Sequence, residues 1–69
     1  MLRYDFQADR PVDFNIHFHD GLTMHYPVEL TRVETSADDF VADANRWYCL
    51  MWTNQGFERA SLSYRIMGP

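Results

Sequence analysis

Residues 12–30 read VDFNIHFHDGLTMHYPVEL, in which apolar and polar residues alternate on both sides of His19-Asp20-Gly21. Alternation with a period of two is typical of strands that bury one face. A three-residue loop that ends in glycine is a common connection within a β-hairpin. The stretch therefore predicts two antiparallel strands, and burial favours the register in which Ile16 lies opposite Met24.

Proline affects two of the expected strands. Alternating apolar residues predict an opening strand over residues 2–7, and Asp9-Arg10-Pro11 follows it. We expect this tripeptide to end the strand, because proline has no N–H to donate to a sheet. Pro27 lies inside the second strand of the hairpin and predicts an edge position or a bulge there.

A helix is expected after the hairpin. Thr35-Ser36-Ala37-Asp38-Asp39 combines a hydroxyl that can cap a first turn with carboxylates that the helix dipole favours. The residues of its expected buried stripe are Phe40, Val41 and Ala44. We favour a helix that ends near Asn45, because the aromatic residues that follow are weak helix formers. The alternative is a longer helix that runs to Gln55.

The last third of the chain predicts a second hairpin. Residues 47–53 are rich in aromatic residues, and Asn54-Gln55-Gly56 has the same pattern as the first loop. Apolar residues alternate again over 60–66, which predicts a final strand. Pairing across the loop sets Tyr48 opposite Leu62 and Leu50 opposite Ala60.

The expected fold class is α+β, with one domain over residues 1–69. The element order is β-β-β-α-β-β, a small antiparallel sheet with the helix packed on one face. The hydrophobic content of 46%, with five Phe, four Tyr and two Trp, is enough for a compact core at this length. A single cysteine, Cys49, excludes an internal disulfide, and with no secretory signal pattern it predicts a cytoplasmic protein.

The charge balance is acidic. Ten acidic residues against six arginines give a net charge of −4. Direct nucleic-acid binding requires clustered Lys or Arg, so we do not expect it. Net acidity favours a basic protein as the partner, and no apolar run is long enough to cross a membrane.

No set of residues predicts catalysis, so we expect a protein that is not an enzyme and has no cofactor. Asp38 and Asp39 are consecutive and diverge, and three glycines form no phosphate-binding loop. In the favoured register His17 and His25 lie on the polar face, and His19 begins the loop. Metal binding by these histidines is one alternative, but no fourth ligand accompanies them, so we expect solvent-facing side chains.

Two surface features point to protein binding. The first is an acidic group at the expected helix start: Glu34, Asp38, Asp39 and Asp43. The second is an apolar stripe on the outward face of the last hairpin: Trp47, Met51 and Phe57. Exposed Trp, Met and Phe are typical of the centre of an interface.

The leading hypothesis is therefore a small non-enzymatic inhibitor or adaptor, of the kind that phages and mobile elements encode. It would cover a basic surface of a host protein, for example one that handles nucleic acid. The alternative is a structural homo-oligomer, such as a homodimer, that packs through the outer face of the last hairpin.

Overall fold

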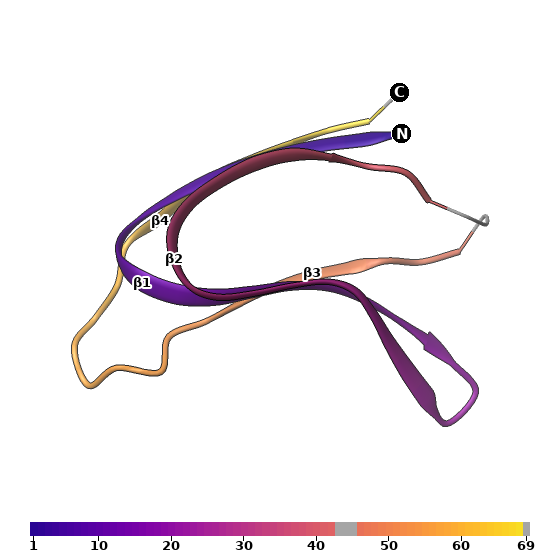
Figure 1. Ribbon diagram of the computed structural model, residues 1–69, viewed down its shortest axis with the longest axis horizontal. Coiled ribbons are helices and arrows are strands. Elements are labelled where there is room, and N and C mark those ends of the chain that lie inside the picture. The colour runs from indigo at the N-terminus through magenta and orange to yellow at the C-terminus, as the bar shows by residue number, and fades with distance from the viewer. Residues whose placement is uncertain (43–45, 69) are drawn as a thin grey trace.

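The computed structural model describes residues 1–42 and 46–68 and contains one antiparallel sheet (Figure 1). Its strands are β1 (Leu2–Asp20), β2 (Thr23–Phe40), β3 (Cys49–Thr53) and β4 (Leu62–Met67). β2 pairs with β1 along one side, whereas β3 and β4 share the other side of β1. β1 is therefore the central strand, and every other strand pairs with it.

The sheet curls back on itself near the middle of β1 (Figure 1). The β1–β2 ladder is interrupted between the pairs Gln7–Thr35 and Val12–Val33, where four residues of β1 face one residue of β2. An excess of residues on one strand bends that strand, and Pro11 cannot donate to the ladder. The bend brings the two halves of β1 face to face.

The core lies between these two halves. The buried hydrophobic residues all belong to β1 at even positions: Tyr4, Phe6, Ala8, Val12, Phe14 and Ile16. The Phe14 ring lies 5.1 Å from that of Tyr4 and 4.8 Å from that of Phe6, centroid to centroid. The ring of Trp52 in β3 lies 5.2 Å from that of Phe14 and 5.0 Å from that of Tyr64 in β4, centroid to centroid. The contact between Trp52 and Tyr64 therefore links β3 to β4. Burial of alternate residues confirms the period-two pattern that the sequence showed in β1.

The expected helix is wrong, and so is the α+β fold class. Among the described residues there is no helix, and residues 35–40 belong to β2 and pair with residues 2–7 of β1. The hydroxyl of Thr35, at the start of the expected helix, donates to the carbonyl of Phe6 at 3.1 Å. Pairing with β1 satisfies the backbone hydrogen bonds of residues 35–40, and this long-range contact outweighs their local helix propensity. The fold is all-β.

The two expected ends of the helix have different outcomes. The end near Asn45 lies outside the described residues, as does Ala44 of the expected buried stripe. The longer helix to Gln55 is wrong, because residues 49–53 form β3. Within the described part of the chain no helix is long and apolar enough to span a membrane.

The first hairpin forms, but with a different register. Asp20 pairs with Thr23, so the turn has two residues, Gly21 and Leu22, and Gly21 has a φ of +61°. Glycine adopts this left-handed conformation without strain, which suits a tight hairpin turn. A register shift at Pro27 then sets Ile16 opposite Val28 rather than Met24. Pro27 therefore lies at a bulge on an edge strand, as the sequence predicted.

The second hairpin does not form. Leu50 pairs with Ile16 rather than Ala60, and Leu62 pairs with Ala8 rather than Tyr48. The bend in β1 gives the strand two separate lengths of unpaired backbone on the same side, one for β3 and one for β4. Pairing with β1 also places Trp52 and Leu62 against the buried face of β1.

Candidate functional site

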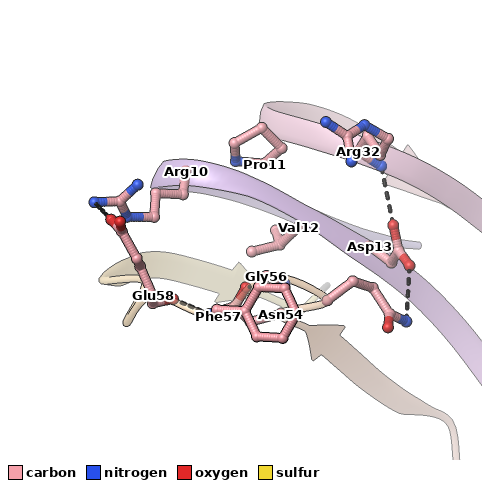
Figure 2. A pocket seen from close by; sticks show the side chains of 10 residues that line it. Arg10, Pro11, Val12, Asp13, Arg32, Asn54, Gly56, Phe57 and Glu58 are labelled. Atoms are coloured by element: carbon pink, nitrogen blue, oxygen red, sulfur yellow. Dashed lines mark hydrogen bonds and ion pairs between the residues drawn. The ribbon is translucent and has the colours of Figure 1, made fainter.

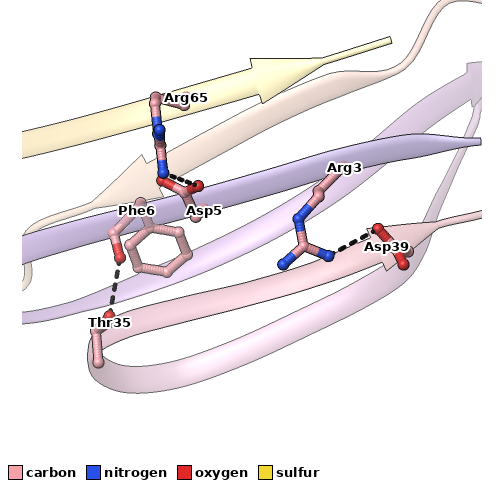
Figure 3. A network of polar contacts seen from close by, with 6 residues as sticks. All are labelled: Arg3, Asp5, Phe6, Thr35, Asp39 and Arg65. Carbon is pink, nitrogen blue, oxygen red and sulfur yellow. Dashed lines mark hydrogen bonds and ion pairs between the residues drawn. The ribbon is translucent and has the colours of Figure 1, made fainter. Parts of the chain in front are cut away.

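The acidic residues of the sequence prediction lie on β2, the edge strand, and do not form a helix face. Glu34, Asp38 and Asp39 are exposed there, and Asp43 lies outside the described residues. Asp39 pairs with Arg3 at 3.1 Å, next to a second pair between Asp5 and Arg65 on the same outer face (Figure 3). Charged residues on an edge strand discourage pairing with other chains, so this group has a structural use of its own.

Asp38 points to the opposite face from Asp39, toward the core. It lies opposite Tyr4, which is 3% exposed. Burial raises the pKa of the Tyr4 hydroxyl, the negative charge of Asp38 raises it further, and a hydrogen bond with Ser36 opposes both effects. The acidic group is therefore divided between the two faces of the sheet.

The three apolar residues expected to form one stripe lie at separate places. Trp47 is 93% exposed just before β3, Met51 lies in β3 opposite Asn15, and Phe57 is 108% exposed in the loop after β3. Because β3 and β4 do not pair, the outer face of a last hairpin does not exist. β3 lies between Trp47 and Phe57, so these two residues cannot belong to one compact patch of this face.

The histidines also differ from expectation. His17 is only 7% exposed, and its Nδ1 lies 2.7 Å from the Asn15 side-chain oxygen. The bulge at Pro27 turns His25 to the other face, where it stacks on Phe18 at 4.9 Å. The expectation of a solvent-facing side chain is therefore wrong for His17, whereas His25 is exposed as expected but lies on the other face. Across residues 1–42 and 46–68, no three His, Cys, Asp or Glu side chains gather closely enough to hold a metal.

A concave site lies where β1 bends, and we call it the bend groove. It encloses about 340 Å³ between residues 10–13 of β1, Arg32 of β2 and the loop 54–58. Figure 2 shows Pro11 and Arg32 on one side and Phe57 on the other. Val12 is buried at its base, so the groove has an apolar floor and charged walls.

Side-chain contacts fix both walls of the bend groove (Figure 2). Asp13 accepts the backbone N–H of Arg32 at 3.0 Å and the side-chain amide of Gln55 at 3.3 Å. An ion pair between Arg10 and Glu58 closes one end. Asn54 accepts the N–H of Gly56 at 3.0 Å and donates to the carbonyl of Glu58 at 2.7 Å. These bonds hold the loop that carries Phe57 in a defined position.

Arg32 has a strained backbone. Its φ is 54°, and it is the one described residue other than glycine with a positive φ. The strain arises because β2 has one more residue than β1 between the pairs Phe14–Leu30 and Val12–Val33. A left-handed conformation costs a residue other than glycine about 1–3 kcal/mol. Such strain is often kept where the side chain has a function.

Sequence reasoning found two parts of this groove but not the groove itself. Asp9-Arg10-Pro11 was expected to end a strand, but β1 runs through it and bends there. Asn54-Gln55-Gly56 was expected as a hairpin loop, and Phe57 as an exposed apolar residue. Nothing in residues 28–34 signals a bulge at Arg32, and no local pattern indicates that these three segments meet. Comparison with models of protein families, with curated proteins and with solved structures finds no match for this chain.

Proposed function

We propose that this protein is a small non-enzymatic module that binds another protein and acts as an inhibitor or adaptor by covering a surface of it. One observation carries the proposal: in the described part of the chain, more large hydrophobic side chains are exposed than buried. Trp47, Phe57 and Leu22 are almost completely exposed. Aromatic side chains such as Trp47 and Phe57 are frequent anchors of protein interfaces, because binding removes their large apolar area from water.

The partner that we propose is basic. The chain has a net charge of −4, and Glu34, Asp38 and Asp39 lie along the edge strand β2. Opposite charge on the partner would speed association and select against acidic proteins. A nucleic-acid-handling protein of a host cell has such a surface, and blocking it is an activity suited to a phage or mobile-element product.

The test begins with capture of partners by the tagged chain from a lysate of its source cell. A captured protein is then purified and titrated with the parent and with Trp47→Ala. We expect Trp47→Ala to weaken binding at least tenfold, mainly through faster dissociation. Val41→Ala is the matched control, because Val41 is also strongly exposed but aliphatic and small. It should change affinity no more than about twofold.

Charge is tested with the same partner. Glu34→Arg should slow association, and the parent's association rate should fall as salt rises from about 50 to about 150 mM. Among the residues that the structure describes, Glu34 makes no ion pair, so its reversal does not break one as Asp39→Arg would. An affinity that neither variant nor salt alters would refute the proposed interface. Light scattering that shows a stable homodimer dissociated by Trp47→Ala would replace it with self-association.

A further inference from the structure

The identity of residue 32 is unexpected for its conformation. A φ of 54° is accessible to glycine without strain, yet the chain has arginine there. The backbone N–H of Arg32 donates to the Asp13 carboxylate at 3.0 Å, whereas its side chain makes no hydrogen bond or ion pair with the residues that the structure describes. The fold therefore needs the backbone of residue 32 and makes no use of its guanidinium group.

The guanidinium group of Arg32 has no carboxylate partner among the residues that the structure describes. Among the described residues, three other arginines pair with acids: Arg3 with Asp39, Arg10 with Glu58, and Arg65 with Asp5. Arg46 lies over the ring of Phe18 at 4.2 Å. Arg32 and Arg59 are left, and Arg59 follows directly after the loop that lines the bend groove. The uncompensated cations of this acidic chain are thus at the bend.

The opposite wall presents an aromatic ring with nothing packed on it. Phe57 is fully exposed, although Asn54 fixes the loop that holds it. Between Phe57 and Arg32 lies the apolar floor at Val12 (Figure 2). A groove of about 340 Å³ can accept a short stretch of peptide. Arg32 would contact a charged group of the peptide, and Val12 and Phe57 would contact an apolar one.

We propose that the bend groove binds an acidic peptide segment of a protein. A carboxylate of the segment pairs with the Arg32 guanidinium, whose planar fork matches a carboxylate. A neighbouring apolar side chain of the segment lies on Val12 and under the Phe57 ring. The bend groove shares strand β2 with Glu34 but is not lined by it. Its charge preference is the opposite, so the proposal does not depend on the proposed basic partner.

The experiment titrates the ¹⁵N-labelled protein with an eight-residue peptide of alternating Asp and Leu with blocked ends. We expect saturable shifts of the amide signals of Val12, Arg32 and Phe57. The same peptide with Asn in place of Asp should bind at least tenfold more weakly, as expected when a charge-assisted hydrogen bond is lost. Equal binding of the two peptides, or shifts confined to β2, would overturn the proposal.

Two variants at residue 32 separate binding from folding. Gly and Asn both accept the left-handed conformation, so Arg32→Gly and Arg32→Asn should melt at the parent's temperature or above it. Both should lose at least tenfold in affinity for the Asp peptide. Arg65→Asn is the control, since it removes the same charge from outside the groove and should alter affinity no more than twofold.

Two further results would count against an acidic peptide. Unchanged affinity in either residue-32 variant would exclude Arg32 from the site. A single-stranded oligothymidine of the same net charge is the second probe. If it competes for the same amide signals at equal or lower concentration, the groove binds nucleic acid instead. We expect the oligothymidine to leave the peptide complex intact. Among the described residues that line the groove, Arg32 is the one cation without an acidic partner and Phe57 the one aromatic ring, whereas single-stranded nucleic acid needs several of each.

Discussion

Phe14→Ala should remove most of the stability of this protein. Phe14 is 1% exposed, and its ring contacts the rings of Tyr4, Phe6 and Trp52 at centroid distances of 4.8–5.2 Å. Truncating a buried Phe to Ala costs about 3–5 kcal/mol, through lost transfer free energy and the cavity left behind. A domain of 69 residues has a free energy of unfolding of roughly 3–10 kcal/mol. Phe14→Ala therefore leaves a chain that is barely folded or unfolded at 25 °C.

The assay is urea unfolding followed by tryptophan fluorescence, because Trp52 contacts Phe14 directly. Phe57→Ala is the matched control: it makes the same chemical change at a fully exposed position and should shift the free energy of unfolding by less than about 0.5 kcal/mol. The reasoning would be refuted by a Phe14→Ala protein as stable as the parent. It would equally be refuted by similar losses in the two variants, since the core would then not lie where β1 folds over itself.

Two more predictions concern polar groups in the core. The raised pKa of Tyr4 means that the unfolded chain loses this proton first, so stability should fall as pH rises above about 10. Urea melts between about pH 8 and 11 should show a smaller alkaline loss in Tyr4→Phe than in the parent. The indole N–H of Trp52 is buried without a hydrogen-bond partner among the described residues. Trp52→Phe removes this unsatisfied donor and should cost less than half of what Trp52→Ala costs. Because both variants lack the Trp52 fluorophore, their urea melts are followed by circular dichroism.

The sequence predicted the parts of the fold that depend on side-chain alternation. Even-numbered residues of β1 are buried as the pattern of Val12, Phe14 and Ile16 indicated, and Pro27 lies at a bulge on an edge strand. The hairpin register was wrong for an instructive reason. Apolar residues do face apolar residues near Ile16, but the bulge achieves this rather than a longer loop.

The parts that failed depend on contacts between distant segments. Residues 35–40 have the capping hydroxyl and carboxylates of a helix start, and only pairing with residues 2–7 makes them a strand. β3 and β4 fit a hairpin by local pattern, and only the bend of β1 provides a better partner for each. Arg32 and its groove could not be predicted, because a bulge of one residue leaves no periodic trace in the sequence.

The central claim is that β1 pairs with β3 and β4 separately and thereby folds over itself. Backbone nuclear Overhauser effects measured on the isotope-labelled protein test it most directly. We expect cross-strand signals between Phe14 and Trp52 and between Phe6 and Tyr64. Signals between Leu50 and Ala60 with none from either segment to β1 would mean a separate hairpin, and would contradict both the fold and the groove built on it.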